Sequence, residues 1–217
     1  MRGIFLTGGI RSGTSWLFSL LEEKINPSYF EQFDYLDLTI RRNLLQDIDQ
    51  FLFKINEDMR QLNSLHAFFP NAKIIVLIRH PLEALHSIHR PNLKSIPFRP
   101  FKDLKTKWRY PEDKDLFPAA LRRLESYFPS DAMSFLKQSN DWLKVFRYED
   151  LLGNFKFHYG ELLKFAEIDR ACTTLDILPQ KTPNQGVRLK EFSESEKDMI
   201  MGSDIPLICK QLGYMDL

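Results

Sequence analysis

The sequence has few cysteines, no long apolar run and no excess of charge of either sign, and each shortage excludes a class of protein. Its two cysteines, Cys172 and Cys209, lie far apart and lack the spacing of a zinc site or a disulfide framework. No apolar run approaches the roughly 18 residues that a membrane-spanning helix needs. Because 30 basic and 29 acidic residues leave a net charge of +1, any basic binding site must be local.

The length and the composition of the chain predict its number of domains, its location and its partners. A chain of 217 residues can bury a sizeable core, so we expect a single domain over residues 1–217. The N-terminus reads as a strand and not as a charged and then apolar signal segment, which predicts a cytoplasmic protein. We expect no nucleic-acid partner, no membrane span and no bound metal, and the sequence leaves the oligomeric state open.

Short apolar runs alternate with helical patterns along the chain. The runs are GIFLTGG near the N-terminus, QFLFKI, AKIIVLIRHP and WLKVFRYED, and the third is rich in β-branched residues. Helices are predicted between them, including one from about Ile40 to Asp49 and one after Asp115 that Pro118 and Pro129 interrupt. Strands alternating with helices predict a three-layer α/β fold with a central, mostly parallel sheet. Such sheets bind ligands beyond the carboxyl ends of their strands.

The segment GGIRSGTS, from Gly8 to Ser15, nearly matches the phosphate-binding loop G-x-x-x-x-G-K-[ST]. It follows a predicted strand and opens a predicted helix, which is the context that such a loop requires. Backbone N–H groups of a glycine turn at a helix N-terminus favour a phosphate. Thr14 replaces the lysine that reaches the β- and γ-phosphates in nucleotide hydrolases. The loop therefore indicates a donor with one phosphate here and a different transferable group.

RSGTSW resembles the 5′-phosphosulfate loop of the sulfotransferases, which take a sulfuryl group from 3′-phosphoadenosine-5′-phosphosulfate (PAPS). Three later segments resemble further signatures of that family in the same order, namely IIVLIRHPLEALHS, VFRYEDLL and the closing GVRLKEFSESE with ICKQLGY. The resemblance implies a PAPS-dependent sulfotransferase with a P-loop-like fold, similar to the carbohydrate and tyrosylprotein enzymes more than to the cytosolic branch. It implies adenosine 3′,5′-bisphosphate (PAP) as the product and no metal.

The resemblance also implies a set of donor-binding residues. The loop would hold the 5′-phosphate, and Arg79 with Ser87, eight residues later, would hold the 3′-phosphate. His80 replaces the usual Asn or Asp, and the Arg-Lys-Gly triplet of the cytosolic branch is missing from the late loop, where Lys190 is one candidate. Trp and Tyr side chains would pack the adenine. The implied donor-binding residues are Arg11, Ser12, Gly13, Thr14, Ser15, Trp16, Arg79, Ser87, Tyr148 and Arg188.

Glu31 is the general base that the resemblance implies. The cytosolic branch has a histidine base after its second strand, whereas FLFKIN has an asparagine at that position and Lys54 at the family's lysine. Other branches place a glutamate after the first helix in a context that SYFEQFDYL resembles. Lys54 and Arg11 would balance charge on the leaving nucleotide. Asp34 and Glu57 remain alternative bases.

The acceptor is implied only as a class, a hydroxylated small molecule or carbohydrate. Residues 90–111 contain four prolines and seven Lys or Arg against one Asp, and a basic segment of this kind would suit an anionic acceptor such as an acidic sugar. Two other functions remain open. One is a P-loop kinase for a small metabolite, on the strength of Gly8, Gly13 and Ser15, and the other is a PAP- or PAPS-binding module without catalysis.

Overall fold

A computed structural model describes residues 2–9, 11–25, 29–33, 50–55, 61–89, 116–128, 136, 140–168 and 189–214. The predicted helix from Ile40 to Asp49 and the basic segment 90–111 lie outside the described residues. The elements follow one another as β1 (Arg2–Gly8), α1 (Thr14–Ile25), β2 (Tyr29–Phe33), β3 (Gln50–Ile55), α3 (Leu62–Phe68), β4 (Ala72–Ile78), α4 (Pro81–His89), α5 (Leu116–Tyr127), β5 (Leu143–Arg147), α6 (Tyr148–Gly153), α7 (Phe155–Phe165), η6 (Leu189–Glu191), α8 (Glu194–Met201) and α9 (Ile205–Gln211).

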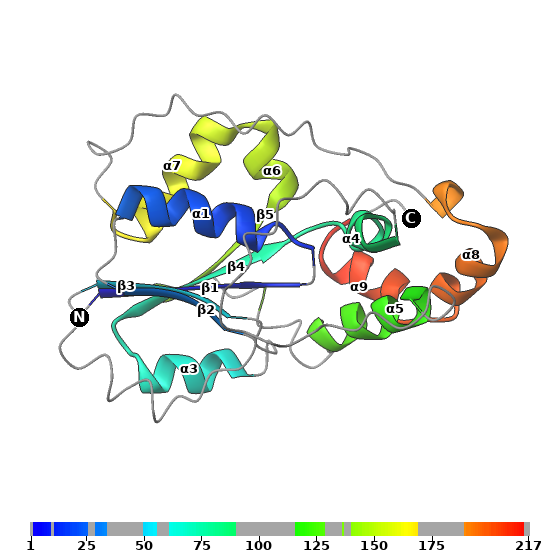
Figure 1. The fold of residues 1–217 in the computed structure, drawn as a ribbon, viewed down its shortest axis with the longest axis horizontal. Helices are drawn as coiled ribbons and strands as arrows, with labels where there is room; N and C mark the ends of the chain where they lie inside the picture. Colours follow the sequence, from blue (N-terminus) through cyan, green and yellow to red (C-terminus); the bar gives the residue numbers. More distant parts are fainter. Residues whose placement is uncertain are drawn as a thin grey trace, which may run out of the picture.

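In the part of the chain that the structure describes, five strands form one sheet in the order β2-β3-β1-β4-β5, and every neighbouring pair is parallel. The carboxyl ends therefore share one edge, which faces α4 and α5 in Figure 1. The chain leaves β1 toward β2 and β3 on one side and reaches β4 on the other, so the loop after β1 lies where the strand order reverses. Ligands bind at such switch points in open α/β sheets. The predicted α/β fold is confirmed.

Two local predictions differ from the structure. Strand β2, YFEQF, was not predicted, because Glu31 and Gln32 interrupt its aromatic residues and because, among the described strands, it pairs with β3 alone. The sequence also predicted that Pro118 would interrupt the helix after Asp115, and this prediction is wrong. Helix α5 begins at Leu116, so Pro118 lies in its first turn, where a missing N–H costs no intrahelical hydrogen bond.

Helices cover both faces of the sheet. α1, α6 and α7 lie on one face and α3 on the other, whereas α4, α5, α8 and α9 gather beyond the carboxyl ends of the strands (Figure 1). On the α3 side, Phe5, Phe51 and Phe53 are at most 1% exposed, and their rings contact one another. Burial of such aromatic surface is the main stabilising term for these layers.

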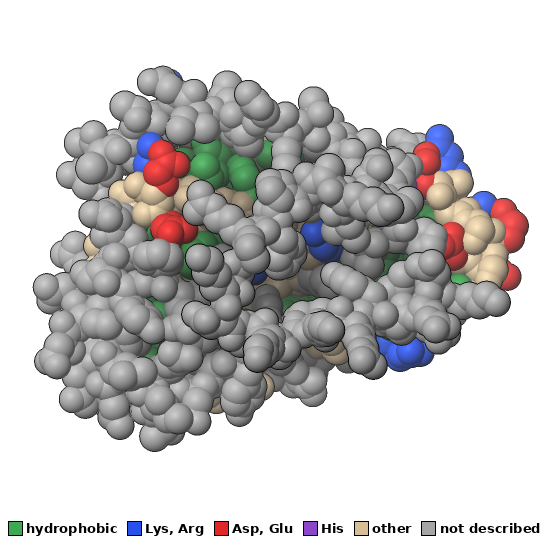
Figure 2. Space-filling model, viewed as in Figure 1, with side chains coloured by type: hydrophobic (Ala, Val, Ile, Leu, Met, Phe, Trp, Pro, Cys, Tyr) green, Lys and Arg blue, Asp and Glu red, His purple; other side chains and the backbone are tan. Residues whose placement is uncertain are grey.

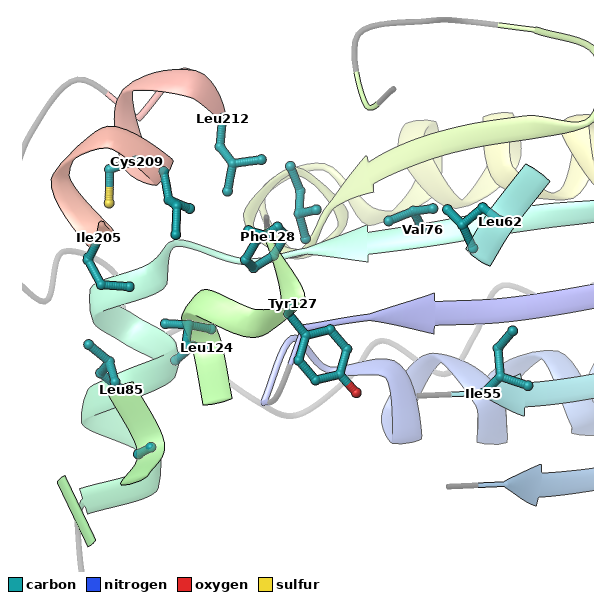
Figure 3. Close-up of a cluster of buried hydrophobic side chains, with 14 of the residues drawn as sticks. Ile55, Leu62, Val76, Leu85, Leu124, Tyr127, Phe128, Ile205, Cys209 and Leu212 are labelled. Atoms are coloured by element: carbon teal, nitrogen blue, oxygen red, sulfur yellow. The ribbon is translucent and has the colours of Figure 1, made fainter. Parts of the chain in front are cut away.

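The helices beyond the strand ends share the core of the α3 face. Leu85 of α4, Leu124 of α5 and Ile205 of α9 point toward one another, and Leu212 continues this cluster toward β4 (Figure 3). These side chains are at most 6% exposed. Their burial fixes α4 and the C-terminal helix against the strand ends that carry the candidate site.

The face of the molecule drawn in Figure 2 carries side chains of both charges near α8. Lys and Arg side chains mix with Asp and Glu around α8 (Figure 2), where Lys197 pairs with Glu194 at 2.6 Å. Within the described ranges, none of the helices combines the length and the apolarity that crossing a bilayer requires.

Candidate functional site

The loop between β1 and α1 makes a tight turn. The Ser12 N–H donates to the carbonyl of Gly9 at 3.0 Å, and both Arg11 (φ 60°) and Gly13 (φ 93°) have left-handed backbone conformations. A left-handed arginine costs of the order of 1 kcal/mol and is found where the surrounding structure compels it, often at functional sites. The loop therefore has a conformation of the kind that collects backbone N–H groups at a helix N-terminus.

Two glycines of the loop are required by packing. A Cβ on Gly8 would lie 2.2 Å from the carbonyl oxygen of Leu77, and one on Gly13 would lie 2.5 Å from the ring of Tyr148. The glycine spacing that resembles a phosphate loop is therefore explained by the close approach of β4 and α6, in addition to any ligand.

Ser12 contributes a buried hydroxyl to the loop. Its side chain is 2% exposed, and its Oγ has no hydrogen-bond partner among the described residues. Buried hydroxyls are nearly always hydrogen-bonded, so an unsatisfied one needs an explanation. An oxyanion bound at the loop would provide the missing partner, and the neighbouring Thr14, 8% exposed, offers a second hydroxyl.

Arg79 and Ser87, which the sequence predicted to act together, both contact the loop. Arg79 follows β4, and its Nη1 donates to the carbonyl oxygen of Arg11 at 3.3 Å. Ser87 lies on α4, and its Oγ accepts from Nε of Arg11 at 3.1 Å. The fold thus brings the two predicted phosphate-binding segments to one residue of the loop.

The orientation of Arg79 is set by two neighbours. Its Nε donates to Oε2 of Glu83 at 3.2 Å, and the side chains of this pair are 10% and 5% exposed. The guanidinium also lies 4.9 Å from the ring centroid of Tyr148, a cation–π distance. Burial raises the pKa of the Tyr148 hydroxyl, and the charge of Arg79 opposes that rise. Arg79 is therefore held in place by groups of the protein itself.

Trp16 and Tyr148 form an aromatic wall behind the loop. Their ring centroids lie 5.7 Å apart with the planes at 85°, and Trp16 also contacts Phe155 at 6.1 Å. Tyr148 is only 8% exposed, and Gly13 packs against its ring. The wall supports the loop, and the adenine contact predicted for these two residues stays a prediction.

Glu31 lies in the middle of β2, and Lys54 lies one residue before the end of the neighbouring strand β3. The ladder between β2 and β3 pairs Glu31 with Phe53 and Lys54 with Gln32, so the two candidates are one register step apart. Lys54 is half-buried and pairs on its other side with Leu6 of β1. The alternative bases and the late-loop arginine, Asp34, Glu57 and Arg188, lie outside the described residues.

Sequence reasoning missed three residues near this site. Glu83 could have been found, because it stands four residues after Arg79 on a predicted helix, the spacing of a helical ion pair. Glu149 and Tyr214 contact each other across 65 residues of sequence, and no local pattern predicts that contact. Lys190, the other late-loop candidate, lies exposed in η6.

The described residues contain no group of three or more His, Cys, Asp or Glu side chains that could hold a metal ion.

Ser15, another predicted loop residue, is exposed at the start of α1, and its carbonyl accepts from the hydroxyl of Ser19 at 3.2 Å. The site that the structure assembles therefore consists of hydroxyls, backbone amides and two arginines, a donor set typical of oxyanion binding.

Comparison with known proteins identifies the family of this fold and site. The chain resembles the mouse sulfotransferase SULT7A1 complexed with PAP (TM-score 0.57, 15% identity, 93% of this chain and 82% of that one). It also resembles the sulfotransferase domain of the olefin synthase from Synechococcus PCC 7002 (TM-score 0.57, 13% identity, 100% and 96%). These likenesses show the fold, and no curated protein matches. A model of the sulfotransferase domain matches residues 2–201, and the chain therefore belongs to the sulfotransferase family.

Proposed function

We propose that the protein transfers a sulfuryl group from PAPS to a hydroxyl of its acceptor. The observation that carries this proposal is the meeting of Arg79 and Ser87 at Arg11, because it joins the two segments expected to bind the two phosphate positions of PAPS. The buried, unsatisfied Oγ of Ser12 supports an anion at the same loop. The mouse enzyme of the same fold binds PAP.

Each part of the donor would have its own binding residues. Backbone amides and hydroxyls from Ser12 to Ser15 would hold the 5′-phosphate at the N-terminus of α1. Arg79 and Ser87 would hold the 3′-phosphate, with Arg79 already oriented by Glu83. Part of the cost of ordering the Arg79 side chain is thereby met before the donor binds.

The transfer itself would take place beyond the loop. The acceptor oxygen forms a bond to sulfur while the bond between sulfur and the bridging oxygen of the 5′-phosphate breaks. The acceptor proton passes to the carboxylate of Glu31, and the electron pair of the broken bond leaves with PAP. Arg11 and Lys54 would stabilise the charge that grows on the bridging oxygen.

Two positions in the sheet support these catalytic roles. Lys54 pairs with Leu6, two residues before the loop begins at Gly8, so it is next to the strand that leads into the proposed phosphate site. Glu31 lies on β2, which pairs with β3 on the side away from β1. A glutamate is ionised at neutral pH without special tuning, as a base must be.

The proposed acceptor is a hydroxylated carbohydrate or small metabolite. The basic composition of residues 90–111, which lie outside the described residues, is the reason to include anionic acceptors. A long segment between two helices is a common source of substrate-binding residues.

Titration calorimetry with PAP in EDTA, and with ATP and Mg²⁺, tests the donor. We expect micromolar binding of PAP without metal and at least about 100-fold weaker binding of ATP, because Thr14 replaces the lysine that ATP requires. Tight binding of ATP that depends on Mg²⁺, with none of PAP, would identify a kinase and overturn the proposal.

Release of sulfate from PAPS to water, and transfer to a panel of hydroxylated acceptors, tests catalysis. We expect Glu31→Gln to lower transfer at least about 100-fold at unchanged PAP affinity. Glu23→Gln is the matched control, since Glu23 is an exposed glutamate of α1. Wild-type protein that binds PAP and never releases or transfers sulfate would be a binding module and not an enzyme.

A further inference from the structure

A second cluster of side chains lies beside the candidate site, around the carboxylate of Glu149. Its Oε1 accepts from the backbone N–H of His80 at 2.8 Å, and its Oε2 accepts from the hydroxyl of Tyr214 at 3.0 Å. One carboxylate thus joins the start of α6, the corner between β4 and α4, and the C-terminal segment. These three places are far apart in the sequence.

Tyr214 is held against this corner on two sides. Its ring centroid lies 4.6 Å from that of His80, and the guanidinium of Arg147 lies 4.9 Å from its ring. Nη2 of Arg147 donates to the carbonyl oxygen of Leu212, the residue that follows α9. The C-terminal segment is therefore fastened to the end of β5 as well as to Glu149.

The turn that presents Tyr214 depends on a glycine. Gly213 has φ 76°, and a Cβ there would lie 2.8 Å from Nη2 of Arg147. The N–H of Tyr214 donates to the carbonyl of Cys209 at 2.9 Å, which closes the end of α9. Such a C-terminal turn with a left-handed glycine is a regular way to end a helix, and here it aims the tyrosine at the strand ends.

Tyr214 is a hydrogen-bond donor over the whole physiological range. Burial, and then the neighbouring Glu149 carboxylate, raises the pKa of its hydroxyl well above the ordinary value of 10.0. The hydroxyl is therefore protonated, and the carboxylate accepts two hydrogen bonds that fix both of its oxygens. Hydrogen bonds to a charged, partly buried acceptor are among the stronger ones in proteins.

The corner that Glu149 holds is also the one that positions Arg79. His80 follows Arg79 directly, and its Nδ1 accepts from the N–H of Leu82 in the first turn of α4. Any shift of this corner moves the guanidinium of Arg79 relative to the carbonyl of Arg11, its partner in the loop. The family model ends at residue 201, so Tyr214 lies outside the part that it matches.

We propose that Arg147, Glu149 and Tyr214 form a C-terminal latch that positions Arg79 for binding of the donor's 3′-phosphate. Glu149 and Tyr214 are positioning residues: they act through the His80 backbone and touch neither donor nor acceptor. That the bound group is the 3′-phosphate of PAPS rests on the proposed function. That Glu149 and Tyr214 fix the corner between β4 and α4 rests on the geometry alone.

PAP affinity of Tyr214→Phe tests the latch. We expect the Kd for PAP to rise about threefold to tenfold, with kcat at saturating PAPS changed less than twofold, because the variant loses position and not chemistry. Glu149→Ala should raise the Kd at least as much. In the Glu149→Ala background, Tyr214→Phe should have no further effect, because its hydroxyl acts through that carboxylate.

Tyr159→Phe is the matched control. Tyr159 is 2% exposed, and its hydroxyl donates to the carbonyl of Leu20 at 3.4 Å, on the other side of the sheet from α9. The control removes a buried hydroxyl of the same kind and should leave the Kd within twofold. An equal effect of both variants, an unchanged Kd in Tyr214→Phe, or a full further effect in the Glu149→Ala background would each overturn the latch.

Amide hydrogen exchange at His80 separates the latch from the proposed function. Tyr214→Phe and Glu149→Ala should speed exchange of this N–H, which donates to Glu149, while Tyr159→Phe should not. If wild-type protein failed to bind PAP, the proposed donor would be wrong. The exchange rate of the His80 N–H would still test whether Glu149 and Tyr214 fix the corner between β4 and α4. Unchanged exchange in both latch variants would overturn that hold whatever the donor.

Discussion

At the carboxyl ends of two neighbouring strands, an arginine lies over a tyrosine, and the two clusters differ in their other contacts. Arg79 follows β4 and lies over Tyr148, while Arg147 ends β5 and lies over Tyr214, each at 4.9 Å from the ring centroid. The ladder pairs Ile78, just before Arg79, with Arg147, so the two clusters are side by side.

The difference lies in the glutamate and in the remaining hydrogen bonds. Glu83 accepts directly from Arg79, which also donates to the carbonyl of Arg11 in the loop. Glu149 instead accepts from Tyr214, and Arg147 donates to the C-terminal segment. The same residue types therefore serve two purposes, one facing the proposed phosphate site and one holding the chain end.

Replacing each arginine by lysine should separate the two clusters most clearly. Arg79→Lys should weaken PAP binding about 100-fold, because lysine lacks the planar fork that reaches Glu83, the loop and a phosphate at once. Arg147→Lys should weaken it only about threefold, through the latch, and should lower the melting temperature. Calorimetry and thermal unfolding of both variants measure this difference, and equal losses of PAP affinity would remove the functional distinction.

Gly13→Ala tests the contact between the first cluster and the loop. A Cβ at this left-handed position would lie 2.5 Å from Tyr148, so we expect transfer activity to fall about 30-fold and the unfolding free energy to drop by about 1–3 kcal/mol. Gly153→Ala is the control, since a Cβ there meets nothing within 4 Å. An active, stable Gly13→Ala variant would show that the loop adapts and that the packing argument is wrong.

Glu83→Gln tests whether the first cluster is also a structural element. The ion pair with Arg79 is largely buried, and the amide keeps an acceptor but loses the charge, so the unfolding free energy should fall by about 2 kcal/mol. Glu194→Gln breaks an exposed pair with Lys197 and should cost no more than about 0.5 kcal/mol. Urea unfolding of both variants measures these losses of unfolding free energy. Equal losses in the two variants would contradict the prediction.

Ionisation of Cys209, a residue of α9, at alkaline pH should lower the free energy of unfolding. This is the smallest of the expected effects. Burial raises the pKa of the Cys209 thiol from 9.0 to about 12, so the unfolded chain loses this proton at a lower pH than the folded one. Stability is therefore full below about pH 9 and falls as pH rises toward 12, by about 1 kcal/mol at pH 10. Unfolding of wild type and Cys209→Ala from pH 8 to 10 measures this, and parallel curves would contradict it.

The fold and much of the loop could be predicted because their signals are local. A β-branched run such as the one from Ala72 to Ile78 forms a buried strand in most contexts, and a glycine turn before a helix indicates an anion site. Strand β2 could not be predicted, because Glu31 and Gln32 interrupt its aromatic residues and only the pairing with β3 marks it as a strand.

The sequence by itself determined the alternation of strands and helices, the glycine positions of the loop and the spacing of Arg79 and Ser87, because each depends on residues close together in the chain. Only the tertiary structure decided that Arg11 lies between Arg79 and Ser87, and that Tyr214 reaches Glu149. Contacts across such separations depend on how helices and strands pack in the shared core, and packing is a property of the whole chain and not of any one segment.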